Sequence, residues 1–211
     1  MDSVNFLKAK IDQKSVLYGL GKFEEGEKTY REVLELQEKM LGKEDPSTLM
    51  SLDNLAVLIS LQGKYDEAEK MCRETLQLKE KVLGKEHFSV LVTMRNLAAQ
   101  LGYQAKWEEA EELYRDSFRM CNKVVGKQHP HTLAIINNLA SLLILQKRYE
   151  EAEKVYREAW QLLETVHGKE HHTTLMAKGN LASALYRQGK YEEWKKLCRD
   201  LETLQLRETS R

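Results

Sequence analysis

Apolar positions along the chain have the spacing of amphipathic helices, and the pattern returns every 42 residues. Leu52, Leu55, Ala56 and Ile59 lie at i, i+3, i+4 and i+7, which places them on one helix face. A break at 62–64 precedes a second amphipathic stretch over 65–83. Together the two stretches predict an antiparallel helix hairpin. Its recurrence predicts an all-α solenoid of about five stacked hairpins.

The repeat is marked by an Asn-Leu-Ala triplet on the first helix and by a small residue on the second. The triplets begin at Asn54, Asn96, Asn138 and Asn180, and the small residues are Ala68, Ala110 and Ala152, with Trp194 in their place in the last copy. We expect one array over 1–211, with units at 1–42, 45–84, 87–126, 129–168 and 171–211. In 1–20 the triplet would fall on polar residues, so the first helix is expected to be degenerate. After Trp194 the array either ends, with this side chain covering its edge, or continues in a longer protein.

Local signals support these boundaries. Asp45-Pro46 suits a helix start, since aspartate is a good N-cap and proline is tolerated in the first turn. Gly84 stands where a left-handed C-cap would end the second helix. The turn residue Gly63 is replaced by Ala105 and Lys147 in the next two copies, so this turn is not expected to require glycine strictly.

Composition restricts the classes of partner. The 33 Lys and Arg residues balance 33 Asp and Glu residues, which argues against a general nucleic-acid or anionic-membrane binder. No apolar run approaches the roughly 20 residues that span a bilayer, and no secretory signal is recognisable at the start. Cys72, Cys121 and Cys198 lack metal-type spacing and are expected to be packed, reduced thiols in a cytoplasmic protein.

No arrangement of residues predicts catalysis, a cofactor or a metal. The histidines recur because the linker between hairpins recurs, and no cysteine or carboxylate pattern completes a zinc site around them. An arginine row on the second helices follows glutamates at i−4, as Arg73 follows Glu69. We interpret this row as a solvated face worth a few tenths of a kcal/mol per pair. The aromatic residues that open the second helices are expected in the core: Phe23, Tyr65, Trp107, Tyr149 and Tyr191.

The triplet, the Gly-Lys-Tyr-Asp-Glu-Ala-Glu segment at 63–69 and the Leu-Gly-Lys-Glu-His linker at 83–87 resemble the tetratricopeptide repeat. The 42-residue form is similar to that of kinesin light chains. The resemblance covers almost the whole chain and implies a right-handed superhelix whose first helices line a concave groove. Similar arrays also serve as ligand-sensing domains of signal-transducing receptor ATPases.

The first helices have a second face that the core stripe leaves open, and we predict that this face binds the partner. The predicted site is Asp53, Asn54, Val57, Leu61, Arg95, Asn96, Ala99, Tyr103, Asn137, Asn138, Ser141, Leu145, Asn180, Ser183, Tyr186 and Arg187. Each asparagine amide of the triplet can donate to and accept from a peptide backbone, as the resembled family implies. Alternatively the amides fix helix stacking. The two interpretations weigh about evenly, with Asn96 and Asn138 favoured as ligand contacts.

The sequence therefore predicts a non-catalytic module that binds a peptide or a helical partner segment. Two narrower versions follow from the resemblance: a cargo adaptor that prefers acidic, tryptophan-bearing peptides, or a sensor domain of a larger receptor ATPase. A groove of near-neutral charge favours the first version less. A different class is a structural array that self-associates weakly through its ends.

Overall fold

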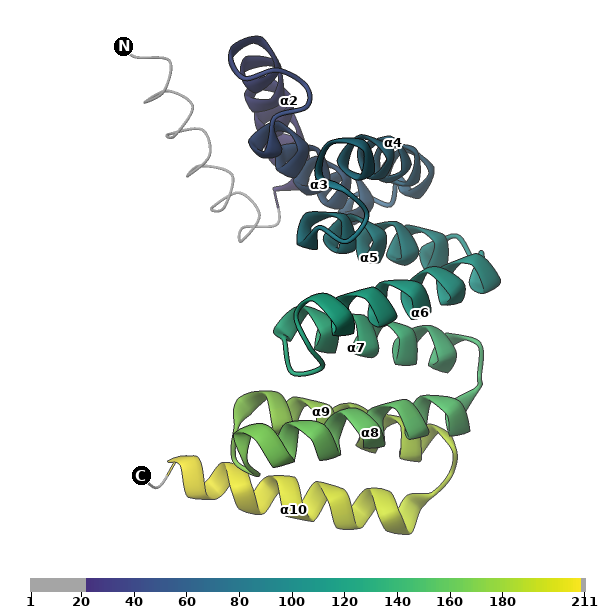
Figure 1. Ribbon diagram of the computed structural model, residues 1–211. Coiled ribbons are helices and arrows are strands. Elements are labelled where there is room, and N and C mark those ends of the chain that lie inside the picture. Colours follow the sequence, from purple (N-terminus) through teal and green to yellow (C-terminus); the bar gives the residue numbers. More distant parts are fainter. Residues whose placement is uncertain (1–21, 210–211) are drawn as a thin grey trace. The chain divides into compact units, whose positions relative to one another are not determined.

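The computed structural model describes residues 22–209, and this part of the chain contains helices and no strand (Figure 1). The expected degenerate helix in 1–20 lies outside the described residues. The helices are α2 (Phe23–Met40), α3 (Pro46–Leu61), α4 (Tyr65–Leu83), α5 (Phe88–Tyr103), α6 (Trp107–Val124), α7 (Pro130–Leu145), α8 (Tyr149–His167), α9 (His172–Arg187) and α10 (Tyr191–Thr209). The all-α prediction is confirmed, and α4 has the predicted bounds.

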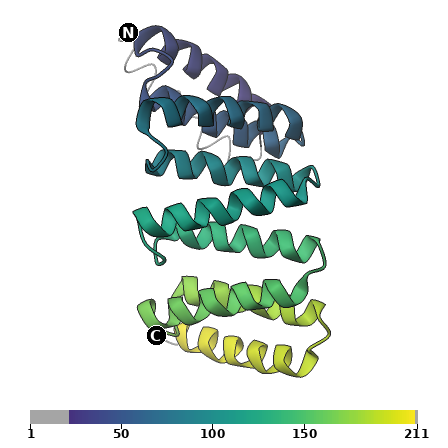
Figure 2. The same cartoon turned by 45° about the vertical axis from the view of Figure 1, so that its right-hand side comes forward.

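The chain divides into two compact units, Met1–Leu113 and Tyr114–Arg211. In unit 1, α2 packs against α3, α3 against α4 and α4 against α5, and α3 also contacts α5. In unit 2, α7, α8, α9 and α10 form the equivalent succession. Helices that follow one another run antiparallel within each unit (Figure 2). The single array over 1–211 stays a prediction.

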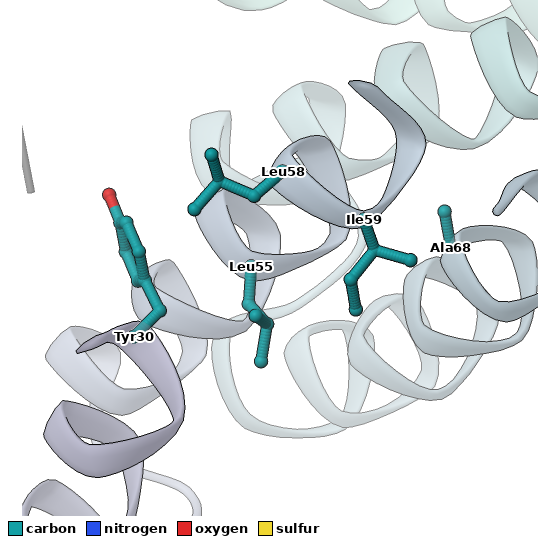
Figure 3. Close-up of a cluster of buried hydrophobic side chains, with 5 residues drawn as sticks. All are labelled: Tyr30, Leu55, Leu58, Ile59 and Ala68. Atoms are coloured by element: carbon teal, nitrogen blue, oxygen red, sulfur yellow. The ribbon is translucent and has the colours of Figure 1, made fainter. Parts of the chain in front are cut away.

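Buried residues of α3 form the centre of an apolar cluster in unit 1 (Figure 3). Leu55, Leu58 and Ile59 of α3 lie between Tyr30 of α2 and Ala68 of α4, and all five are at most 8% exposed. Alanine suits the α4 position because its methyl group lets two helices approach closely. Ala152, the equivalent residue of α8, is fully buried in the same way.

The linkers cap the first helices in two ways. Before α3 the Asp45 carboxylate accepts a hydrogen bond from the Ser47 backbone N–H at 2.8 Å, as predicted. Histidines take this role before the later first helices. The Nδ1 atoms of His87, His129 and His171 accept from backbone N–H groups at the starts of α5, α7 and α9, at 3.1–3.3 Å. The recurring linker histidine is therefore an N-cap residue.

The turn inside each hairpin requires a positive φ. The φ angle is +78° at both Gly63 and Gly189, and Ala105 and Lys147 adopt +59° and +61° at the equivalent positions. A Cβ atom disfavours this region by about 1–2 kcal/mol. The turn thus accepts non-glycine residues at an energetic cost. At the other end of α4, Gly84 has φ +83° and ψ 152°, so it is not the predicted left-handed cap, although this φ still favours glycine.

A cluster of four side chains, here called the inter-hairpin clamp, joins successive hairpins within each unit. In each, a second-helix glutamate accepts hydrogen bonds from the arginine at i+4 and from a glutamine and a lysine at the turn of the next hairpin. Distances to the glutamate oxygens are 2.7–3.1 Å. The clamps are Glu27–Arg31–Gln62–Lys64, Glu69–Arg73–Gln104–Lys106 and Glu153–Arg157–Gln188–Lys190.

The clamp glutamates are largely buried, with side chains 11–14% exposed. Burial alone would raise the pKa of these carboxyls, but the hydrogen bonds from cationic and amide partners outweigh it and lower the pKa of Glu27, Glu69 and Glu153 to about 2. The interpretation of the arginine row as a solvated face of weak ion pairs is therefore incomplete, because its glutamate partners are largely buried. Each glutamate also connects two hairpins, which fixes the neighbouring first helices.

Some expected core positions lie closer to the surface. The aromatic residues that open the second helices are half-buried, and Tyr191 is 52% exposed. They stand at the turn, where one side of the ring covers the hairpin and the other meets solvent. This edge of each unit consequently presents aromatic surface.

Candidate functional site

In unit 1 the predicted binding face lies on α3 and α5, which contact each other. Leu61 and Tyr103, the last residues of these helices, are 44% and 60% exposed. The Tyr103 ring stacks on Tyr65 with centroids 5.0 Å apart. Val57 and Ala99, which lie one helical turn before Leu61 and Tyr103, are half-buried. The structure therefore places Leu61 and Tyr103 at an accessible apolar edge, with Val57 and Ala99 partly accessible beside them.

Asp53 does not lie on the exposed part of this face. Its side chain is 6% exposed and forms an ion pair with the fully buried Lys79 of α4. Thr93 of α5 donates a hydrogen bond to the other carboxylate oxygen at 2.7 Å. Lys79 also donates to the Thr93 hydroxyl at 3.0 Å and to the Ser89 carbonyl at 3.3 Å. Asp53 thus joins three helices of unit 1 and is removed from solvent contact with a ligand.

This buried network was not predicted from the sequence. The position of Lys79 is occupied by Gln37 in α2, Cys121 in α6 and Leu163 in α8, all buried, so the repeat pattern indicates an uncharged residue there. Burial raises the pKa of the Asp53 carboxyl, while Lys79 and Thr93 act in the opposite direction. The one available signal was the departure of residue 79 from the pattern.

The asparagines of unit 1 have different surroundings. Asn96 is 9% exposed, and its amide oxygen accepts from the Arg95 guanidinium at 3.2 Å. Asn54 is half-buried. Within the described part of the chain the amide of Asn54 has no hydrogen-bond partner, so its donor and acceptor remain open to a ligand.

Unit 2 repeats this contrast on α7 and α9. The Asn180 amide donates to the Asn137 amide oxygen at 3.0 Å and links the two first helices. Asn138 is half-buried, and its amide makes no hydrogen bond to other described residues. The stacking role therefore applies to Asn180, while Asn138 stays available as a ligand contact.

The remaining predicted residues of unit 2 are accessible. Ser141, Leu145, Ser183, Tyr186 and Arg187 are exposed, with Leu145 at 61% and Tyr186 at 53%. The Ser141 and Tyr156 hydroxyls are 3.4 Å apart. Two rings contact Tyr186 edge-on, those of Tyr191 and Trp194, with centroids 5.6 and 5.1 Å away.

Formal charge is sparse on the first helices and predominantly positive. Among α3, α5, α7 and α9 the acidic residue is Asp53, which Lys79 neutralises. The cations are Arg95, Lys178 and Arg187. Lys178 is 5% exposed, with its ammonium 5.0 Å from the centre of the Trp160 ring. The face of each unit is therefore weakly basic, although the chain as a whole is neutral.

The described residues contain no cluster of three or more His, Cys, Asp or Glu side chains suited to a metal ion. Over the same range, no helix combines the length and apolar character that crossing a membrane requires. The cysteines are free thiols, and burial raises the pKa of Cys72 to about 12. This thiol is consequently a packing group.

Solved structures of helical repeat proteins superpose on the chain over nearly its full length. A kinesin-light-chain protein of Podospora anserina with nearly identical TPR-like repeats is 23% identical, with a TM-score of 0.84 and 100% of both chains covered. BtubC from P. vanneervenii is 21% identical, with a TM-score of 0.80, 97% of this chain and 83% of that chain covered. These similarities show the fold.

A signal transduction ATPase with a tetratricopeptide repeat sensor, from Pyrococcus horikoshii, has a TM-score of 0.70 at 17% identity. The match covers 99% of this chain and 31% of the ATPase. No curated protein matches the sequence.

The sequence profile of the tetratricopeptide repeat matches residues 51–123, 89–165 and 131–193, and a second profile of the same repeat matches 15–47. The matches cover most of the chain and agree with the hairpins described above. The chain belongs to the tetratricopeptide repeat family.

Proposed function

We propose that this chain is a non-catalytic interaction module that binds a peptide or a helical partner segment along its first helices. Protein interaction is the general role of tetratricopeptide arrays. The observation that carries the groove proposal is the open hydrogen-bonding capacity of Asn54 and Asn138. Solvent reaches both amide groups, and a peptide backbone offers a donor and an acceptor that can replace their contacts with water.

Exposed apolar side chains would supply most of the affinity. Met50, Leu61 and Tyr103 are 44–60% exposed in unit 1, and Leu145, Met176 and Tyr186 are 50–61% exposed in unit 2. Large apolar and aromatic contacts dominate binding energy at protein interfaces. Because these residues stand on helices that are already packed, little ordering cost falls on the receptor.

The charge on the first helices favours an acidic ligand. Asp53 is neutralised by Lys79 inside unit 1. The other formal charge on α3 and α5 is the cation Arg95, and Arg187 is exposed on α9. This distribution supports the adaptor version, in which acidic, tryptophan-bearing peptides bind as the kinesin-light-chain resemblance implies. The sequence had predicted a groove of near-neutral charge, which favoured this version less.

A second candidate is a ligand-sensing domain within a larger signalling protein. It is favoured by the similarity to the tetratricopeptide sensor of the Pyrococcus horikoshii ATPase, which corresponds to a minor part of that protein. Both candidates use the same faces. We place either one in the cytoplasm, supported by the three free thiols.

A peptide-display selection tests the proposal. The chain and an Asn54→Ala/Asn138→Ala variant are screened in parallel, with Asn96→Ala/Asn180→Ala as the matched control, because those two amides already have protein partners. We expect peptides selected by the wild type to be lost with the first variant and retained with the control, provided that circular dichroism shows both folded.

Equal enrichment by the wild type and the Asn54→Ala/Asn138→Ala variant would refute the role of the open amides. An empty selection, together with a concentration-dependent mass in light scattering, would favour the self-associating array instead.

A further inference from the structure

The arginine row on the second helices is more than a set of local pairs. Arg31 contacts Glu27 at 2.8 Å on its own helix and Glu67 at 2.9 Å on the next second helix. Arg157 likewise contacts Glu153 at 2.7 Å and Glu193 at 2.6 Å. Arg73 has the same two kinds of partner, Glu69 and Glu109. Each of these guanidinium groups is therefore held between two carboxylates.

Arg199 occupies the same repeat position on α10 and has neither carboxylate. The residue four positions earlier is Lys195, and the Arg199 Nε donates to the Lys195 carbonyl at 3.4 Å. No carboxylate among the described side chains contacts Arg199. The carboxylate that the other arginines find four residues earlier on their own helix is thus replaced by a lysine on α10.

The apolar position next to the clamp is also altered on α10. Ala68 and Ala152 are fully buried, whereas their counterpart Trp194 is half-buried and contacts Tyr186 edge-on at 5.1 Å. Trp194, Lys195, Cys198 and Arg199 line an open hollow together with Glu192. We call these five residues the α10 face.

Other hairpins show which groups such a face receives. At Glu153 the next hairpin contributes two donors, Gln188 and Lys190. Equivalent donors brought to α10 would meet the Lys195 ammonium, and the indole of Trp194 would occupy the space that alanine leaves open. At Arg157 the next hairpin also contributes the carboxylate of Glu193. The α10 face therefore reverses the charge requirement at Lys195 and keeps it at Arg199. It needs an occupant that supplies carboxylates.

We propose that the α10 face docks a helical segment of a partner protein that carries Asp or Glu beside an apolar side chain. The carboxylate binds Arg199 and Lys195, and the apolar side chain enters the hollow beside Trp194 and Cys198. A helical occupant is inferred because the corresponding faces of α4 and α8 receive the helices α5 and α9.

The same charges disfavour a second copy as the occupant. The face presents two cations and the acid Glu192, which already pairs with Lys195 at 3.1 Å. Two such faces would oppose their cations at short range, which is unfavourable. The peptide in the proposed function binds the first helices instead, although Tyr186 of that site adjoins the α10 face through Trp194.

The test is a display selection of amphipathic helices with randomised surface positions, made against the full chain. Arg199→Glu is the test variant. Lys196→Glu is the matched control, since it makes the same charge change on the same helix outside the hollow. Both side chains are exposed, so both variants are expected to fold, as circular dichroism would verify.

We expect the enriched helices to carry Asp or Glu. A synthetic peptide from this set should bind Arg199→Glu at least about tenfold more weakly than wild type, the effect of losing a charge-assisted hydrogen bond, as measured by fluorescence anisotropy. Lys196→Glu should retain affinity, and a peptide with its acid changed to Lys should recover binding to Arg199→Glu. The Asn54→Ala/Asn138→Ala variant should bind the acidic helix normally.

Equal binding by wild type and Arg199→Glu would overturn the proposal, as would a selection without enrichment of acids. Dimerisation that Arg199→Glu abolishes in light scattering would replace the partner helix with a second copy.

Discussion

Replacing Lys79 with leucine tests the interpretation of the buried network in unit 1. Lys79 is fully buried, and its partner carboxylate on Asp53 is 6% exposed. Without the ammonium, Asp53 becomes an uncompensated buried charge that keeps the hydrogen bond from Thr93. Removal of one partner of a buried ion pair costs about 3–5 kcal/mol. Because the remaining hydrogen bond offsets part of this loss, we expect Lys79→Leu to lower the unfolding free energy by about 3 kcal/mol.

The double variant Lys79→Leu/Asp53→Asn should recover most of this loss. It introduces the residues found at the same positions of unit 2, Leu163 and Asn137, and it leaves no buried charge. Buried ion pairs are often replaced by neutral residues at little cost or with a gain. We therefore expect the double variant to lie within about 1 kcal/mol of wild type.

Urea denaturation followed by circular dichroism gives these differences, and hydrogen exchange locates the loosened helices, because repeat arrays need not unfold in one step. Lys81→Leu is the control, since its ion pair with Glu44 is exposed. We also expect the defect of Lys79→Leu to shrink as the pH is lowered from neutral. Burial raises the pKa of Asp53, and the variant lacks the ammonium that opposes this rise. The carboxyl group of the folded variant therefore takes up a proton at a higher pH than that of the unfolded chain, which stabilises the fold as the pH falls.

Two results would refute this reasoning. One is a Lys79→Leu variant as stable as the Lys81→Leu control, which would mean that the ammonium is not needed inside the unit. The other is a double variant whose loss of unfolding free energy equals the sum of the losses of Lys79→Leu and Asp53→Asn. Independent contributions add in this way, while those of a coupled pair do not.

Three further predictions concern the turns, the clamps and the caps. Lys147→Gly should raise the unfolding free energy by about 0.5–1 kcal/mol, and Gly63→Ala should lower it by about 1 kcal/mol, in thermal melts, because this turn needs positive φ. The unfolding free energy should fall as pH drops from about 4.5 towards 2, where the clamp glutamates, whose pKa is lowered, become protonated. Glu69→Gln should make this fall smaller by about 1–2 kcal/mol, a figure that allows for solvent screening of its partners. His87→Ala should cost about 1 kcal/mol and His87→Asp should retain stability in the same melts, since the latter restores a capping acceptor; equal losses would contradict a capping role.

The sequence was sufficient for the hairpins because their signals are local. Tyr65–Leu83 has the predicted bounds, set by the turn before it and by Gly84 after it. The caps were predicted where the residue type is common, as at Asp45, and missed where histidine takes the role. Periodicity identifies the recurrence of His87 but not the orientation of its ring.

The predicted site depended on contacts that periodicity does not contain. Asp53 and Asn54 adjoin in sequence and share the same apparent face, yet one is buried against Lys79 and the other is left with an open amide. The partner of Asp53 lies 26 residues away on another helix. Only the packing of α3, α4 and α5 brings the two together, and one-dimensional spacing gives no measure of it.

The clamps and the packing of the first helices together explain why Asn180 bonds to another helix while Asn138 does not. A clamp fixes one hairpin against the next through a second-helix glutamate, as Glu153 does by binding Gln188 and Lys190. The first helices of those hairpins are then close enough for Asn180 to reach Asn137. The Asn180 amide thereby uses one of its two N–H donors within the protein and has fewer hydrogen bonds to offer a ligand. Asn138 remains open beside a pair that is already fixed, so a peptide would meet a preformed surface and would itself bear most of the ordering entropy.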